Sequence, residues 1–267
     1  MKKTFEFSRE HLEFLKNEQK KKASVHALRI LILICFFSLW EILSRYGVID
    51  AFLTSSPSRI LSTIGDLVRT DTFATHVLTT LFETVAGFVI ATLTGTAVAL
   101  LLWWSPFLRK TLEPFIIVLN SLPKIALGPI IIIWFGSGMK AIVFMAVIIT
   151  VIVTIIGMLN GFLACDEGKI MLLRSMGANR FQILTKLILP FSLPTFISCL
   201  KINVGLAWIG SIMGEYLSSR QGIGYLIVYG GQVFQLDLVM ASTVILCALA
   251  GGMYAFVALL EKILVKK

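Results

Sequence analysis

Apolar runs long enough to cross a membrane alternate with short polar connections along most of this chain. A helix needs roughly 20 mainly apolar residues to span the hydrocarbon core of a bilayer. Runs of this kind cover residues 30–49, 84–103, 112–135, 141–163, 191–214 and 238–260. The pattern predicts an all-α polytopic membrane protein with about six transmembrane helices. Residues 27–267 then form one transmembrane domain, preceded by a basic tail over residues 1–26.

One connection is too long and too polar to be a simple turn. It covers residues 165–190, between the fourth and fifth predicted spans. Asp166 is suited to cap a first helix, and Gly177 is suited to the left-handed conformation that ends it. Asn179 can cap a second helix, which we expect to close at Pro190. The sequence therefore predicts a helix, a break and a second helix in this connection.

Basic residues indicate the side of the membrane on which each connection lies. The chain has 267 residues, 57% of them hydrophobic, and a net charge of +9. If both termini are cytoplasmic, most of the 24 Lys and Arg residues lie in the inner segments, as the positive-inside rule requires. This orientation places residues 165–190 in the cytoplasm. It also explains the positive charge without nucleic acid, because no aromatic-rich basic stripe accompanies it.

The third predicted span is interrupted by prolines. Pro114, Pro123 and Pro129 all lie within residues 112–135. Each interior proline removes a backbone hydrogen bond, so we expect a kinked or broken helix. Broken helices in membranes usually line a cavity. Lys124 follows the central proline, and it either faces such a cavity or caps the carbonyl groups that the prolines release.

The sequence offers no set of residues for catalysis or metal binding. The four cysteines are dispersed in or beside apolar segments and have neither zinc nor disulfide spacing. No cluster of His, Cys or carboxylate residues suggests a metal, and no nucleophile–base set suggests catalysis. No Walker phosphate-binding motif occurs, so we expect this chain to bind no ATP and no other cofactor. Energy for transport must then come from a partner or from an ion gradient.

The cytoplasmic connection admits two interpretations from physical chemistry alone. A short helix with apolar residues at its tip and arginines at its rim could fill a groove on a partner protein. The alternative is an ordinary amphipathic loop that lies on the lipid surface. The residues at issue in the first interpretation are Ile170, Met171, Leu173, Arg174, Met176, Gly177, Ala178, Arg180, Leu189 and Pro190.

The connection resembles the coupling loop of bacterial ABC importer permeases. Gly177, nine further residues and then Leu187-Ile188-Leu189-Pro190 match the second half of that motif. Met171-Leu172-Leu173 stands where the family has Glu-Ala-Ala, so a contact normally made by the glutamate is missing. Other stretches are similar to the nitrate, sulfonate and taurine branch of the family. They are Leu53–Ile60, Leu119–Gly136 and Gly214–Ile227.

The resemblance implies the composition of the whole transporter. The chain would be one non-catalytic permease subunit of a homodimer in the bacterial cytoplasmic membrane, with both termini in the cytoplasm. Two ATPase subunits, which bind ATP and magnesium, would dock on residues 165–190. An extracytoplasmic solute-binding protein would deliver the solute. That solute would be a sulfonate-, taurine- or nitrate-like anion, or a pyrimidine of the kind used to make thiamine.

Five residues are candidates for the solute path: Lys124, Pro123, Asn203, Glu83 and Glu215. An ionisable residue inside a membrane is a functional candidate by default. Glu83 stands where anion importers of this resemblance tend to carry arginine. This favours a neutral or cationic solute, unless the glutamate is merely interfacial. Glu215 lies at the outer end of the fifth span, where an outer gate could lie.

The main alternative is a secondary transporter that is driven by an ion gradient and works without an ATPase. Such a protein predicts an inverted repeat and paired intramembrane carboxylates. The sequence shows neither, since Glu83 and Glu113 lie near the ends of different predicted spans. A membrane-embedded enzyme is a third possibility, but it would need clustered catalytic residues near one interface.

Overall fold

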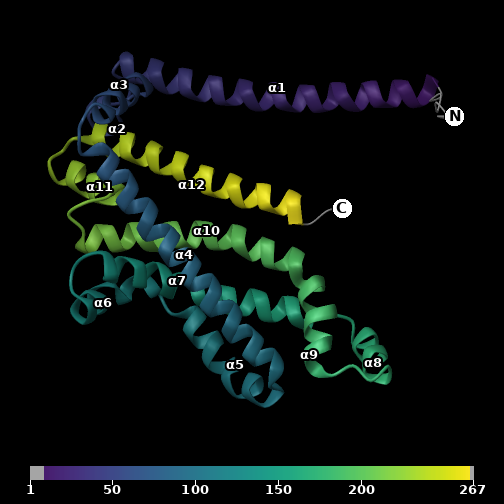
Figure 1. Ribbon diagram of the computed structural model, residues 1–267. Helices are drawn as coiled ribbons and strands as arrows, with labels where there is room; N and C mark the ends of the chain where they lie inside the picture. Colours follow the sequence, from purple (N-terminus) through teal and green to yellow (C-terminus); the bar gives the residue numbers. More distant parts are fainter. Residues whose placement is uncertain (1–8, 265–267) are drawn as a thin grey trace. The chain divides into compact units, whose positions relative to one another are not determined.

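A computed structural model describes residues 9–264, and every regular element among them is a helix (Figure 1). The chain divides into two units between Ser62 and Thr63, and each is described by itself. The predicted all-α fold is confirmed. The helices follow from long apolar runs whose backbone polar groups can only be satisfied internally within a bilayer.

The first unit contains α1 (Arg9–Arg45), α2 (Ala51–Thr54) and the beginning of α3 (Pro57–Val68). The predicted boundary at residue 26 falls inside α1, which is unbroken there. Glu41, near the end of α1, accepts hydrogen bonds from the backbone N–H of Ser58 at 3.0 Å and from its hydroxyl at 2.8 Å. This carboxylate joins the end of α1 to the beginning of α3.

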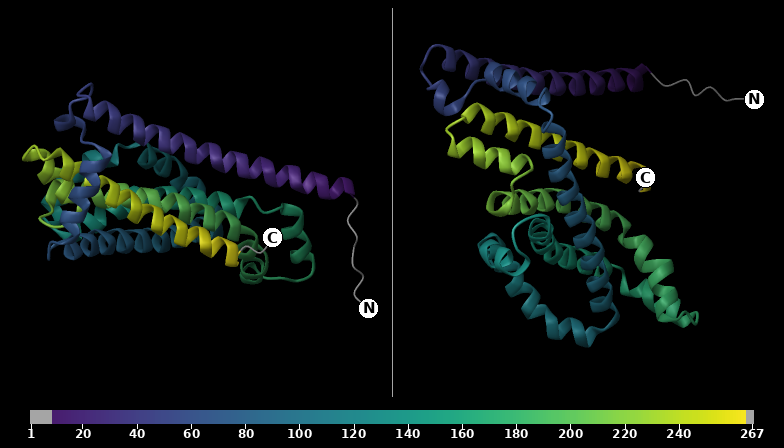
Figure 2. Two further views of the ribbon diagram at one scale, coloured as in Figure 1. Left: turned by 90° about the horizontal axis from the view of Figure 1, so that it is seen from above. Right: turned by 60° about the vertical axis from the view of Figure 1, so that its left-hand side comes forward.

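The second unit is built on α7 (Met139–Leu163), against which α4 (Phe73–Trp104) and α10 (Leu189–Ser218) both pack extensively. Figure 2 shows these three helices crossing closely, and α4 also contacts α10. Small residues permit the approach. A Cβ on Gly210 of α10 would lie 2.4 Å from the Cα of Ala146 on α7. A Cβ on Gly87 of α4 would lie 2.5 Å from the Cβ of the same alanine.

The remaining helices of the second unit surround this three-helix centre. α11 (Ile223–Gln232) packs against α12 (Leu236–Leu264), and both contact α10. α5 (Pro106–Ser121), the 3₁₀ turn η1 (Lys124–Leu127) and α6 (Gly128–Phe135) form an elbow with an 85° bend. The predicted break in the third span is therefore confirmed, and it lies at Leu122 and Pro123.

The connection between α7 and α10 contains three short helices. They are α8 (Glu167–Ser175), α9 (Arg180–Ile183) and the π-helical turn η2 (Leu184–Ile188). The chain then continues into α10 without leaving the helical conformation.

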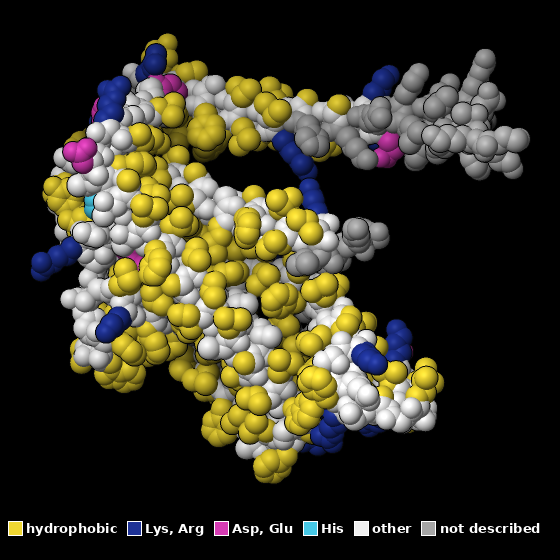
Figure 3. Space-filling view, in the orientation of Figure 1, with side chains coloured by type: hydrophobic (Ala, Val, Ile, Leu, Met, Phe, Trp, Pro, Cys, Tyr) yellow, Lys and Arg dark blue, Asp and Glu magenta, His cyan; other side chains and the backbone are white. Residues whose placement is uncertain are grey.

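Among residues 9–264, five helical stretches are long and apolar enough to cross a membrane, and the elbow is a sixth if it counts as one span. The five stretches are Ala23–Arg45, Phe73–Trp104, Met139–Leu163, Arg180–Ser218 and Leu236–Ile263. Hydrophobic side chains cover much of the surface that Figure 3 displays. Ile133 and Trp134 of the elbow, for example, are 80% and 71% exposed. Such a surface is suited to lipid, which is as apolar as the side chains.

Candidate functional site

The connection between α7 and α10 has the helix–break–helix form that the sequence predicts. The Asp166 carboxylate accepts a hydrogen bond from the N–H of Gly168 at 2.7 Å and caps α8. Gly177 has a φ of +83°, the left-handed conformation in which glycine is favoured. Asn179 and Gln182 form a reciprocal capping box at the start of α9. Local capping chemistry therefore sets the break between the two helices.

The expected end of the second helix at Pro190 is wrong. Helix runs from Arg180 through η2 into α10, and Pro190 lies in the first turn of α10. The N–H of Leu189 bonds to the carbonyl of Leu184, five residues back. Inside an α-helix, a proline ring clashes with the carbonyl group one turn earlier, and its nitrogen has no hydrogen to donate. The π turn widens the helix at this point. The helix therefore accommodates Pro190 and continues past it.

The connection is fixed to the three-helix centre by buried side chains. Ile183 is 2% exposed and Ile188 is fully buried, in a cluster with side chains of α4 and α7. Ile170, Leu173 and Ala178 pack against the same cluster. These three predicted docking residues therefore face the chain's own core. Their packing attaches the connection to the membrane helices.

The other face of the connection exposes large apolar side chains. Met171 is 73% exposed, Met176 is 74% exposed and Leu172 is 60% exposed. Phe181, on α9, is 63% exposed. We call these four residues the docking face. Leu172 and Phe181 were not among the candidates from the sequence, although the helical spacing of Leu172 and Met176 would have placed those two side chains together.

The remaining predicted docking residues lie around this face. Arg174, Gly177, Leu189 and Pro190 are exposed. Arg180 is exposed too, but its guanidinium donates to the carbonyl oxygen of Trp104 at 3.3 Å and so ties the connection to the end of α4. A notch of about 140 Å³ lies between these elements, lined partly by Trp103, Arg174 and Arg180.

Two glutamates meet at the opposite end of α7 from the connection. Glu83 of α4 and Glu215 of α10 are 2% and 1% exposed, and their carboxyl groups contact each other. This corrects the expectation from the sequence that no carboxylates are paired within the membrane segments. The pair could not be recognised from the sequence because 131 positions separate its members and only the packing of α4 on α10 joins them.

The turn between α10 and α11 encloses the Glu215 carboxyl group. Its Oε2 accepts from the N–H of Gly224 at 2.6 Å, and the Thr80 hydroxyl is a further partner. That hydroxyl also accepts from the N–H of Ile223 at 2.7 Å. A Cβ on Gly222, whose φ is +109°, would lie 2.4 Å from the Glu215 carboxyl carbon. Only glycine fits this close approach.

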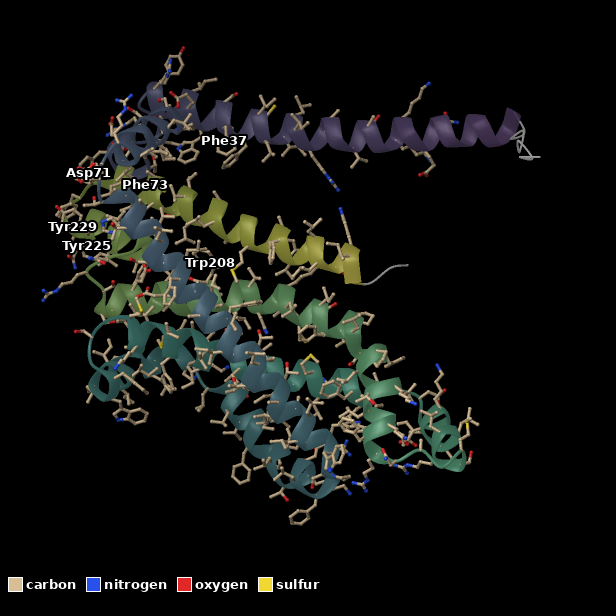
Figure 4. The ribbon with its side chains drawn as sticks, viewed as in Figure 1. Phe37, Asp71, Phe73, Trp208, Tyr225 and Tyr229 are labelled. Atoms are coloured by element: carbon tan, nitrogen blue, oxygen red, sulfur yellow. The ribbon has the colours of Figure 1, made fainter. Side chains whose placement is uncertain are left out.

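An aromatic ladder lies beside this turn. The His76 ring stacks on Tyr225 with ring centres 6.1 Å apart, and Tyr225 stacks on Tyr229 at 6.0 Å. Figure 4 shows the two tyrosines close together on α11, near Phe73 at the start of α4. The N–H of Gly222 donates to Nδ1 of His76 at 3.0 Å. The first turns of α4 are therefore joined to the Gly222–Gly224 turn by rings and by hydrogen bonds.

The other three path candidates lie apart from the glutamate pair. Pro123 is at the elbow, and the Lys124 ammonium donates to the carbonyl of Asn120 at 3.0 Å, which supports the carbonyl-capping alternative. Asn203 is 1% exposed and lies between α4 and α7. Within residues 9–264, no group of three or more His, Cys, Asp or Glu side chains is placed to hold a metal ion.

A model of one protein family matches most of the chain. Residues 85–267 match the family described as binding-protein-dependent transport system inner membrane component. The matched range contains the connection, Glu215 and every helix of the three-helix centre, apart from the beginning of α4.

Curated relatives are similar over most of their length. A formylaminopyrimidine transport permease protein, ThiX, of Halalkalibacterium halodurans is 30% identical over 76% of this chain and 81% of its own length. A probable ABC transporter permease protein of Haemophilus influenzae is 27% identical over 84% and 91%. The taurine transport system permease protein TauC of Escherichia coli is 25% identical over 84% and 83%.

Two solved structures share the fold. A chain of the MetNI methionine ABC transporter in an inward-facing conformation aligns with a TM-score of 0.63 and 19% identity, over 74% of this chain and all of that one. A chain of a bacterial alginate ABC transporter, in complex with its pentasaccharide-bound periplasmic protein, aligns with a TM-score of 0.64 and 15% identity, over 94% and 98%.

Proposed function

The chain belongs to the binding-protein-dependent transport system inner membrane component family, the permeases of ABC importers, and we propose that two copies of it form the solute path of one importer. In this assembly each copy binds one cytoplasmic ATPase subunit through the docking face. ATP and magnesium are bound by the ATPases, and the permease itself is not catalytic. A solute-binding protein delivers the solute on the outer side of the cytoplasmic membrane.

The docking face is the observation that carries this proposal. Three large apolar side chains project from this polar segment: Met171, Leu172 and Met176. Their exposure to water would be unfavourable. A groove on a partner protein that accepts these side chains would remove them from water. Because Ile183 and Ile188 fix the connection to the core, motion of the partner would be transmitted to α7 and α10.

The orientation of the chain rests on its basic residues. Lys169, Arg174, Arg180 and Lys186 lie in or beside the docking connection, and further basic residues lie at both termini. The positive-inside rule supports a cytoplasmic location for these segments. The ATPases would then meet the docking face from the side on which ATP is available.

The names of the relatives limit the class of solute but do not identify the solute of this chain. Their names include transport of formylaminopyrimidine, of aliphatic sulfonates and of taurine. These are small polar molecules of different charge. For this chain we propose a small polar solute of the same size range.

Co-purification with the candidate ATPase tests the docking face. Met171→Glu combined with Met176→Glu should abolish ATPase binding in detergent or nanodiscs, while the permease still inserts into membranes. The control is Val48→Glu, which places a single glutamate on a residue that is 70% exposed in the first unit. Retained binding by the double variant would refute the assigned role of the docking face.

The glutamate pair favours a second candidate, since paired intramembrane carboxylates are a feature of ion-driven carriers. Uptake into proteoliposomes separates the two functions. Uptake by an importer requires the ATPase, with ATP on the side of the bilayer where the ATPase lies. A secondary transporter works with the permease alone and an imposed ion gradient.

A further inference from the structure

We propose that a pocket beside Glu83 is a subsite for a solute that carries an amino group or another N–H donor, whether the solute as a whole is neutral, cationic or zwitterionic. This inference rests on the proposed function, because it assigns a solute class to the transport path. It concerns α4, the turn before α7 and the end of α10, all of which belong to the second unit.

The pocket has a volume of about 300 Å³, the lower end of the range for small-molecule sites. Thr79 and Glu83 contribute from α4, and Ser137–Met139 contribute from the turn before α7. Ser218 contributes from the end of α10, and Ser219–Gln221 contribute from the turn after it. The pocket is thus lined by both polar and apolar groups, and Glu83 supplies a carboxyl group to its wall.

Glu83 has an acceptor that the protein leaves unused. The Oε2 atom of Glu83 is buried and has no hydrogen-bond partner. The carboxyl group of Glu215 has the N–H of Gly224 and the Thr80 hydroxyl as partners, although its Oε1 is also buried without a partner. Of the two carboxyl groups, that of Glu83 lines the pocket. Since a buried polar atom without a partner is unfavourable, the free oxygen of Glu83 is the natural place for a donor from the solute.

The contact between the two carboxyl groups decides which solute group fits. Two carboxylates in contact would repel each other, so a proton held between them is the arrangement that permits the contact. The unpartnered Oε2 of Glu83 can accept a hydrogen bond. An N–H donor satisfies this oxygen, whereas a sulfonate, carboxylate or nitrate group has no hydrogen to donate to it.

The rim of the pocket explains why a zwitterion remains admissible. Arg220 lines the pocket and is exposed, and no other charged side chain besides Glu83 contributes to its wall among the described residues. A solute with an anionic group at one end could direct it to Arg220 and its amino group to Glu83. The amino group is therefore the shared requirement, and the charge of the rest of the solute is free to vary.

Matched pairs of probes test the requirement on the permease–ATPase complex in nanodiscs. Taurine is compared with ethanesulfonate, and 4-aminopyrimidine with pyrimidine, by saturation-transfer NMR. We expect the amino member of at least one pair to bind about tenfold more tightly than its partner, because a site built to hydrogen-bond a donor rejects the analogue that lacks it. Equal binding within both pairs, or no binding by either amino compound, overturns the inference.

Variants of Glu83 identify the acceptor. Glu83→Met removes the oxygen and should abolish the preference, whereas Glu83→Gln keeps an oxygen acceptor beside Glu215 and should retain it. Glu113→Met, a carboxyl group outside this pocket, is the control and should leave the preference unchanged. A preference that survives Glu83→Met overturns the inference, and if that variant does not fold, the wild-type probe pairs still decide it.

The same preparation separates this inference from the proposed function. If the wild-type permease captures no ATPase, the proposed function fails whatever the probes show. If it captures the ATPase normally but shows no amino preference, only the assignment of this subsite fails.

Discussion

The side-chain nitrogen of Asn203 lies 2.9 Å from the hydroxyl oxygen of Thr154, so one amide on α10 is hydrogen-bonded to α7 inside the membrane domain. The same nitrogen donates to Thr92 of α4 at 3.1 Å. Both threonine oxygens act as acceptors, and Asn203 is 1% exposed. One side chain therefore joins the three helices that form the centre of the second unit, an arrangement that favours a structural role for Asn203.

Asn203→Leu should destabilise the folded permease. The substitution removes both hydrogen bonds and leaves two threonine hydroxyls facing an apolar side chain. Interhelical hydrogen bonds in membranes are worth about 0.6 kcal/mol each on average, so we expect a loss of roughly 1–2 kcal/mol in the free energy of unfolding in mixed micelles. Ile202→Leu, at a neighbouring residue that is 55% exposed, should cost much less. Equal losses would contradict the assignment.

Gly210 and Gly205 provide a matched pair on α10. A Cβ at Gly210 would lie 2.4 Å from the Cα of Ala146, whereas a Cβ at Gly205 would meet nothing within 4 Å. Gly210→Ala should force α10 away from α7 and cost about 1–3 kcal/mol of stability. Gly205→Ala should be neutral or stabilising by up to about 1 kcal/mol, since alanine is the better helix former. Thermal unfolding in detergent measures both.

A stable Gly210→Ala variant would show that α7 and α10 can separate without loss. That result would contradict the close packing described for the three-helix centre. The packing itself was foreseeable only in part, because a glycine in an apolar run marks a close approach without naming the partner helix.

The sequence predicted elements where local chemistry decides the conformation. Asp166, Gly177 and Asn179 each act within a few residues of their own position, and the structure has the predicted cap or turn at all three. The break at Pro123 is of the same kind. Pro190 was misjudged because its effect depends on the π turn that precedes it, and that turn has no separate signature in the sequence.

Long-range contacts account for what the sequence did not predict. Glu83 and Glu215 are adjacent only because α4 and α10 pack together, and the alternation of apolar and polar residues does not reveal which faces meet. The docking residues show the same limit. Their apolar character was evident, but the division into Met171 outside and Leu173 inside depends on how α8 lies on the core.

An ion pair joins the interior of α10 to the last turns of α12. The Lys201 ammonium of α10 lies 2.6 Å from the Glu261 carboxylate of α12. A double-mutant cycle with Lys201→Met and Glu261→Gln should give a small favourable coupling energy, because the pair is partly exposed and its charges are partly screened. Each single variant leaves one charge alone, so the double variant should be more stable than the two single losses predict. Strict additivity of the two losses would contradict the pair.

The reactivity of Cys165 can show whether the connection between α7 and α10 stays packed on the core. It is 4% exposed and lies in the cluster that holds Ile183 and Ile188. Burial raises the pKa of its thiol above the usual range, so at neutral pH less of it is the reactive thiolate than in a free cysteine. A maleimide should therefore modify Cys165 about tenfold more slowly than a cysteine at an exposed neighbouring position.

Ala164→Cys in a Cys165→Ala background provides that comparison, since Ala164 is exposed. Because the folded-state pKa of Cys165 is raised, its reaction rate should keep rising with pH after the rate at position 164 has levelled off. Binding of an ATPase that pulls the connection away from α4 and α7 would expose the thiol and speed its modification, measured by mass spectrometry. Equal rates at the two positions without an ATPase would mean that Ile183 and Ile188 do not fix the connection to the core, and the mechanical coupling proposed for the docking face would then lose its structural basis.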